Sequence, residues 1–329
     1  MLRQFRTLLG FCDNMEQLQL KTKCQISLII ATFAVSWASI FITILLDNGV
    51  PPVVIAFWRL FLSVIFLIPF ILRLEIRKQF KLYFNFTYQG FFMLSGLFLS
   101  LHFLSWIQSL TSLSVAVSVL VVNSSPIWVV VFSFLLLREK ITQNQLIGLF
   151  LGFMGLFLIS LTPTSQQNNT ILPEGIFLAL FGAFMVAFYF MIGKHMRTQH
   201  TVPNIPYVFF VNLFCSIFLL LFAFLLGDNV LRFTQADLIW FIALAIGPSL
   251  LGHALYIYAM KHFSAQTVSL AVIGETVGAS LLAWLIFSQV LPPITLVGGF
   301  LVLFGIYLDV KFDIPSDMKK NKFDKISNE

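Results

Sequence analysis

Apolar residues in this chain of 329 residues are grouped in long blocks, with short polar stretches between them. A block of about 20 apolar residues, folded as an α-helix that rises 1.5 Å per residue, crosses the hydrocarbon core of a bilayer. The pattern predicts ten such helices, at 25–46, 53–72, 88–109, 114–137, 143–161, 175–193, 205–226, 237–259, 265–287 and 292–310. We therefore predict an all-α polytopic membrane protein.

Composition supports this class of protein. Hydrophobic residues make up 59% of the chain, charged residues only 10%, and the mean hydropathy is +0.93. Soluble domains carry about 25% charged residues, so the polar side chains here are too few to cover a water-exposed surface. The polar, basic start has no small-residue cleavage site and does not resemble a signal peptide, and Met15 is an alternative start. Cys12, Cys24 and Cys215 lack metal-ligand spacing, and we expect no disulfide.

Lysine and arginine are distributed unequally between the two sets of loops. Eighteen of the 20 lie in the termini and loops on the N-terminal side of the predicted membrane, whereas the opposite loops hold only Arg232, and Arg59 lies within a span. By the positive-inside rule, both termini are predicted to be cytoplasmic, in a plasma or inner membrane. Orientation thus accounts for the net charge of +6. Because no aromatic–basic interleaving accompanies that charge, we expect no nucleic-acid partner.

Two halves of the chain repeat a similar pattern. The runs "SLHFLSWIQS" and "LGHALYIYAM" place His102 and His253 in the same position, 151 residues apart, and Gly148 matches Gly298 at a spacing of 150. The repeat unit contains five helices. Since five is an odd number, the second copy is predicted to lie inverted in the membrane, the architecture of alternating-access transporters.

This repeat sets the expected domain organisation. The first five-helix repeat spans 25–161 and the second spans 175–310. A cytoplasmic segment at 1–24, an external linker at 162–174 and a cytoplasmic tail at 311–329 complete the chain.

Three stretches resemble the drug/metabolite transporter superfamily, specifically its EamA-type ten-helix members: "FWRLFLSVIFLIPF", "SPIWVVVFSFLLLREKITQNQLIGLFLGFMGLFLIS" and "GETVGASLLAWLIF". The resemblance runs over about 25–310. It implies a carrier of small metabolites, often exchanging them against protons or another solute, with a cavity lined by helices 1, 3, 4, 6, 8 and 9. The family usually has Glu-Pro where this chain has Glu275 and Thr276, so the ninth helix is expected to be straighter.

Two charged residues lie inside predicted spans. An arginine at mid-helix costs about 2.5–3.5 kcal/mol on insertion scales, which makes Arg59 unusual. It is either an anchor or ion pair with Asp47, or a counter-charge for an anionic substrate group. Glu275 lies near the middle of span 9. Because burial disfavours the charged form of a carboxyl group, Glu275 is a candidate proton carrier, the alternative being a carboxyl that stabilises helix packing.

The paired histidines are candidates for the same site. A single histidine in an apolar span is more often a packing residue than a ligand. However, inverted repeats bring equivalent positions to one central axis, so His102 and His253 are predicted to face one cavity. Imidazole exchanges a proton near neutral pH and can donate to a substrate oxygen. Two histidines without a cysteine or a further carboxylate form an incomplete metal set, and we expect no metal.

Helix 4 contains "VNSSPIW", in which Pro126 removes a backbone hydrogen bond and predicts a kink. Asn123 and Ser118 are then candidate binding residues, although the kink could equally serve packing. Trp37 and Tyr189 are further candidate lining residues.

Glycines at regular spacing on helices 5 and 10 predict close helix packing or a homodimer contact. The chain contains no Walker loop, no Ser-His-Asp arrangement and no paired carboxylates within spans, so neither enzyme activity nor a cofactor is expected. The sequence predicts a secondary transporter of a small metabolite, amino-acid-like, nucleoside-like or amphipathic. An intramembrane enzyme or a lipid-handling scaffold is the alternative.

Overall fold

The computed structural model describes residues 22–73, 80–136, 141–161, 173–287 and 291–313. Within these ranges ten helices are long and apolar enough to cross a membrane, as the sequence predicts. We number them as spans 1 to 10. They are Thr22–Asp47 (its last part α2, Ala38–Asp47), α3 (Pro52–Ile71), α5 (Phe86–Ser109), Val115–Leu136 (α6, Val115–Val122, and α7, Ser125–Leu136), α8 (Gln143–Ser160), α9 (Pro173–Thr198), α10 (Asn204–Leu226), Gln235–Ala259, α13 (Ala265–Phe287) and α14 (Pro293–Phe312).

Local sequence signals define several helix ends. Thr142 caps α8 in a capping box, in which its hydroxyl accepts from the Gln145 amide and the Gln145 side chain accepts from the Thr142 amide. Prolines occupy the first turns of α3 and α14, where their missing N–H costs no hydrogen bond. Gly227 ends α10 in the left-handed conformation, with φ of 75°, which glycine adopts without steric strain.

Two spans are interrupted. Span 4 is broken at Asn123 and Ser124 into α6 and α7, immediately before Pro126. Span 8 runs through a short 3₁₀ turn η2 (Gln235–Asp237), α11 (Leu238–Leu244), a π-helix η3 (Ala245–His253) and α12 (Ala254–Ala259). The π-helix contains Pro248, whose ring is incompatible with regular α-helical hydrogen bonding. Span 9, without a proline after Glu275, is one continuous helix.

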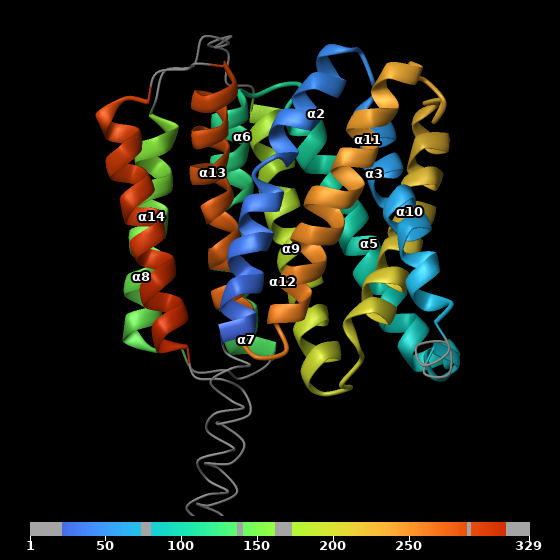
Figure 1. Cartoon of the computed structure of the whole chain (residues 1–329), viewed down its shortest axis with the longest axis horizontal. Helices are drawn as coiled ribbons and strands as arrows, with labels where there is room; N and C mark the ends of the chain where they lie inside the picture. The colour runs from blue at the N-terminus through green and yellow to red at the C-terminus, as the bar shows by residue number, and fades with distance from the viewer. Residues whose placement is uncertain (1–21, 74–79, 137–140, 162–172, 288–290, 314–329) are drawn as a thin grey trace, which may run out of the picture.

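Helices from the two halves of the chain pack against each other throughout the bundle (Figure 1). The α5 helix packs on α9 and α10, and α3 packs on α10. The α8 and α14 helices form a pair at one edge of the bundle. The core therefore lies between the halves rather than within either of them.

The α8–α14 pair is held by reciprocal glycine contacts. A Cβ on Gly148 would lie 2.7 Å from the carbonyl oxygen of Gly305, and one on Gly305 would lie 2.5 Å from that of Gly148. Gly155 and Gly298 approach each other in the same way. The glycine faces thus serve packing within the chain, and a homodimer contact would need other surfaces of these helices.

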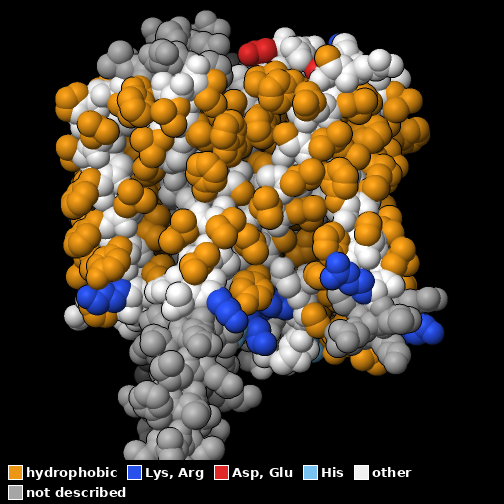
Figure 2. All heavy atoms as spheres, viewed as in Figure 1, with side chains coloured by type: hydrophobic (Ala, Val, Ile, Leu, Met, Phe, Trp, Pro, Cys, Tyr) orange, Lys and Arg blue, Asp and Glu red, His pale blue; other side chains and the backbone are white. Residues whose placement is uncertain are grey.

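The face of the bundle shown in Figure 2 is apolar over most of its height. Large hydrophobic side chains such as Phe224, Phe300 and Phe150 are more than half exposed. A surface of this kind is stable in lipid and not in water. The protein is an integral membrane protein.

Both ends of the described chain lie at the same end of the bundle, which is the lower end in Figure 1. There the carboxylate of Asp313 accepts a hydrogen bond of 2.6 Å from the Ser264 amide, between spans 8 and 9. The exposed basic residues of this end (Lys23, Arg73, Lys81, Lys261 and Lys311) define what we call the basic end. Arg232 is exposed in the connection that leads to span 8, at the opposite end.

Candidate functional site

A small cavity lies between the two halves, in the middle of the bundle, and measures about 30 Å³. It is lined by polar side chains from five spans together with apolar ones. The polar group is Arg59, His102, Trp106, Asn123, Ser125, His253 and Glu275, and the apolar group is Val35, Ala38, Val122, Val186, Phe190 and Val272. These residues come from spans 1, 2, 3, 4, 6, 8 and 9, so the cavity matches the expected helix set with span 2 added.

Unpartnered polar atoms are concentrated in this cavity. Five buried nitrogen or oxygen atoms of its lining residues have no hydrogen-bond partner: Nη1 and Nη2 of Arg59, Nε1 of Trp106, Nδ1 of His253 and Oε1 of Glu275. Buried polar groups in folded proteins are almost always satisfied, because leaving one unpaired costs about 1–3 kcal/mol. Such a concentration makes this cavity the candidate site for a polar ligand.

Arg59 is fully buried in α3 and does not pair with Asp47, which is exposed. Its Nε donates to the Ser249 hydroxyl at 3.1 Å, and its guanidinium carbon lies 4.2 Å from the ring centre of Phe103. The cation–π contact and the hydrogen bond hold the guanidinium plane in place. The predicted ion pair between Arg59 and Asp47 is therefore absent. Nη1 and Nη2 of Arg59 have no partner among the described residues and are available to a ligand.

His102 and His253 both line the cavity, as predicted from their matched positions. His102 donates from Nδ1 to the Gly182 carbonyl at 2.9 Å, which leaves Nε2 of the neutral ring as an acceptor. The two rings are not in contact: Phe103 lies edge-on to His253 with centroids 5.3 Å apart and also neighbours His102 at 4.9 Å. Among the described residues, no group of three or more His, Cys, Asp or Glu side chains is placed to hold a metal ion.

Glu275 is 5% exposed and faces the cavity from α13. Glycines flank it on the side of span 1. A Cβ on Gly278 would collide with Ser36, and one on Gly274 would lie 2.8 Å from Cγ2 of Thr32. These glycines allow span 1 to pack directly on α13, and this packing places the carboxyl between the halves.

The helix break in span 4 brings two more polar groups to the cavity. Asn123 and Ser125 line it, and Asn123 Nδ2 donates to the Thr276 hydroxyl at 3.4 Å. Ser118, in contrast, lies outside it. Its hydroxyl is hydrogen-bonded to that of Ser109 at 2.7 Å, which ties α6 to α5. The structure therefore gives Ser118 a packing role.

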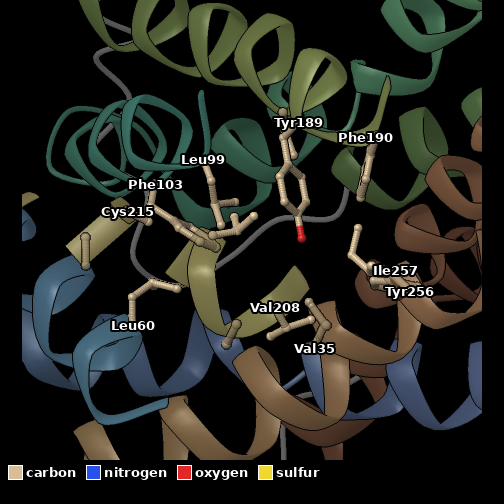
Figure 3. Close-up of a cluster of buried hydrophobic side chains, with 14 of the residues drawn as sticks. Val35, Leu60, Leu99, Phe103, Tyr189, Phe190, Val208, Cys215, Tyr256 and Ile257 are labelled. Carbon is tan, nitrogen blue, oxygen red and sulfur yellow. The ribbon is translucent and has the colours of Figure 1, made fainter. Parts of the chain in front are cut away.

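The two aromatic candidates differ in position. Trp37 is part of an aromatic row along span 1, stacked on Phe41 with ring centres 5.5 Å apart, and does not line the cavity. Tyr189 is buried beside the cavity, with its ring 6.3 Å from that of His253. Figure 3 shows its hydroxyl pointing into a cluster of buried side chains that includes Leu99 and Ile257.

Sequence reasoning missed two residues of this site. Trp106 lies one helical turn after His102, with the two rings stacked at 6.0 Å, and Ser249 lies one turn before His253. Helical spacing from each histidine is the signal that identifies them. The orientation of Ser249 toward Arg59, however, depends on the π-helix.

Two buried cations were also missed, and both satisfy backbone carbonyls. Lys194 Nζ donates to the carbonyls of Met260 and Phe263 at 2.9 and 2.8 Å, and Arg197 donates to those of Ile257 and Val202. Carbonyls near the end of a helix attract cations. These residues therefore stabilise the end of span 8, and neither of them lines the cavity.

A larger hollow of about 530 Å³ lies on the outside of α7. Its lining is wholly apolar and includes the exposed side chains of Val131, Phe134 and Leu135. A lipid-facing hollow without a polar group has nothing to orient a polar solute, so we assign the site to the central cavity.

A ten-helix membrane bundle with a polar cavity between its halves has the architecture of a membrane carrier. The EamA-like transporter family matches the chain over residues 22–161 and again over 173–310. The protein belongs to the EamA-like transporter family. Proteins of this kind move solutes and are not enzymes.

Named relatives agree with the family assignment, and a solved structure agrees with the fold. Two proteins from Archaeoglobus fulgidus, each named an uncharacterized transporter, are 28% identical over 204 residues (62% of this chain, 70% of theirs) and 26% identical over 202 residues (60% and 69%). A protein of known crystal structure is 17% identical and superposes with a TM-score of 0.70, covering 87% of this chain and 96% of its own. That likeness shows the fold alone.

Proposed function

We propose that this protein is a secondary active transporter, which moves a small polar metabolite across the cytoplasmic membrane by alternating access. The observation that carries the proposal is the set of five unpartnered polar atoms in one buried cavity, contributed by spans 2, 3, 8 and 9. A site built from both halves near the middle of the membrane is the arrangement by which inverted-repeat carriers bind their substrates.

An inverted repeat is supported by the α8–α14 contact. At the repeat spacing of 150 residues, Gly148 corresponds to Gly298 and Gly155 to Gly305. A two-fold axis in the membrane plane therefore exchanges the Gly148–Gly305 contact with the Gly298–Gly155 contact, and both are present. The basic end supports a cytoplasmic location for both termini.

Cavity size supports a change of conformation during transport. A volume of about 30 Å³ has room for only a few water molecules, so a metabolite enters only when the halves move apart. We propose that the present conformation is closed around the site. Either Glu275 or the histidine pair changes its protonation between the outward-facing and inward-facing states, which couples transport to protons or to solute exchange.

An intramembrane enzyme or lipid scaffold is less well supported. Such a protein would gather its polar groups near one face of the membrane. In this bundle they converge in one cavity that residues from seven spans line.

Flux in proteoliposomes tests the proposal. The full chain is reconstituted, and uptake of radiolabelled amino acids and nucleosides is measured with and without a pH gradient. We expect saturable uptake of at least one solute that the gradient alters, and we expect Glu275→Gln to remove the effect of the gradient. Glu174→Gln, the same change at an exposed position, serves as the control.

Two results would contradict it. Absence of uptake or exchange by the wild-type protein for every solute of both classes would overturn the transport function. A gradient effect that persists in Glu275→Gln and in the double variant His102→Ala, His253→Ala would overturn the coupling role of these residues.

A further inference from the structure

The central cavity contains one group of each charge, and each has unpartnered atoms. Arg59 is fully buried, with Nη1 and Nη2 lacking a hydrogen-bond partner, and Glu275 has an unpartnered Oε1. The two side chains line the same cavity and yet do not hydrogen-bond to each other through these atoms. A buried charged group whose polar atoms lack hydrogen-bond partners destabilises the protein, because the hydration of those atoms is lost and not replaced.

The guanidinium of Arg59 is positioned as a rigid fork. Its Nε is held by Ser249 and its face by the ring of Phe103, so the two terminal nitrogens are the free side of the plane. Two parallel N–H groups of a guanidinium match the two oxygens of a carboxylate. A ligand that satisfies both nitrogens at once therefore presents a carboxylate or a group of the same shape.

Glu275 requires the opposite partner. Its flanking glycines bring span 1 close, and its Oε1 accepts no hydrogen bond from the protein. A carboxylate in apolar surroundings is best satisfied by a charged donor, and a primary ammonium provides three N–H groups. A single ligand that carries both a carboxylate and an ammonium would satisfy the two residues together.

The residues that line the cavity determine the net charge of the substrate and the polarity of its side chain. Among the residues that the structure describes, Arg59 and Glu275 are the only Lys, Arg, Asp or Glu residues that line the cavity, and their charges cancel. Much of the rest is formed by short apolar side chains such as Val35, Ala38 and Val272. A ligand with a third charged group would find no partner here, whereas an aliphatic side chain would be buried.

We infer that the substrate is a neutral, zwitterionic amino acid with an aliphatic side chain. Its carboxylate binds the Nη1 and Nη2 atoms of Arg59, and its ammonium donates to Glu275. This assignment rests on the proposed function, because it takes the central cavity to be the transport site. Glu275 is ionised when the amino acid is bound.

Competition between matched compounds tests the assignment. The purified full chain, reconstituted in proteoliposomes, is assayed for uptake of radiolabelled L-alanine, L-valine, L-leucine and uridine. Unlabelled competitors are L-valine, 3-methylbutanoate (which lacks the ammonium), 2-methylpropan-1-amine (which lacks the carboxylate) and uridine. We expect L-valine to inhibit at concentrations about 30-fold or more below those of the two analogues, since removing one partner of a buried charge pair costs at least about 2 kcal/mol.

Variants separate the two ends of the ligand. We expect Arg59→Lys, which keeps the charge and loses the fork, to weaken L-valine binding by about 10-fold or more. We expect Glu275→Gln to remove the preference for L-valine over 3-methylbutanoate. The exposed changes Arg232→Lys and Glu174→Gln are the controls. Thermal unfolding of each variant, with and without L-valine, distinguishes lost binding from lost folding.

Each outcome has a distinct meaning. If 3-methylbutanoate competes as well as L-valine and Glu275→Gln changes neither, the ligand is an anion and the zwitterion assignment is wrong, while transport stands. Uridine uptake without amino-acid uptake likewise overturns only the assignment. If the wild-type protein takes up no tested solute, the proposed function fails together with it.

Discussion

At the scale of the residue, the position of a polar side chain in the sequence predicts its role at the cavity less well than its surroundings in the structure do. His102 and Ser118 are both buried polar residues inside apolar spans, yet only His102 lines the cavity. Ser118 satisfies its hydroxyl on Ser109 within the packed helices. His253 retains an unpartnered Nδ1. We therefore attribute ligand binding to the residues with unsatisfied atoms and not to polarity as such.

The histidine pair leads to a prediction about substrate affinity. We expect His102→Ala and His253→Ala each to raise the KM for uptake by about 10-fold, because each removes a hydrogen-bonding group from the cavity. His200→Ala, near the basic end, is the matched control, since its ring contacts His195 and Tyr88 and not the cavity. Unchanged KM in both cavity variants would exclude the paired histidines from the site.

At the scale of the element, helix irregularities position the site. The break in span 4 brings Asn123 and Ser125 to the cavity, and the π-helix in span 8 brings Ser249 to Arg59 and ends at His253. Single π-helical turns are frequent at functional sites, where they reorient side chains by changing the helical period. The equivalent helix of the first half, α5, is regular, so the two halves differ at this point.

The glycine contact between α8 and α14 is the second determinant at this scale. A side chain at Gly155 would meet the backbone of Gly298 and Val302. We expect Gly155→Val to lower the thermal midpoint of unfolding, by the equivalent of about 1–3 kcal/mol, because overpacking forces the helices apart. Gly90→Val is the control, since nothing lies within 4 Å of a Cβ built there. Equal midpoints for the two variants would mean that close packing of this pair adds no stability.

At the scale of the whole molecule, the arrangement of charge predicts the orientation in the membrane. We expect a cysteine replacing Arg232 to react with a membrane-impermeant thiol reagent in intact cells, and one replacing Lys311 to react only after permeabilisation. Both side chains are exposed, and Cys24 and Cys215 are buried. Cys12, which lies outside the described residues, is first replaced by serine. Labelling of the Lys311 position alone in intact cells would reverse the predicted orientation. Labelling of both positions in intact cells would contradict the odd number of spans between them, and with it the inverted repeat.

Much of the architecture was predictable from the sequence for a physical reason. Lipid satisfies no backbone hydrogen bonds, so each spanning segment must be a helix whose length matches the bilayer, and length and apolarity are local properties. The ten predicted spans agree with the structure to within a few residues at nearly every boundary. The cavity contains His102, His253, Asn123, Glu275 and Arg59 as predicted candidates.

The remaining features depended on how the helices are rotated and packed, which no single span determines. Trp37 and Ser118 do not line the cavity. Trp106 lines it, and Ser249 accepts a hydrogen bond from Arg59. The sequence alone determined ten membrane helices in two similar halves, with basic residues predicted on one side. Only the tertiary structure decided which polar atoms remain unpaired, because a hydrogen-bond partner for Arg59 or Glu275 would have to come from another helix.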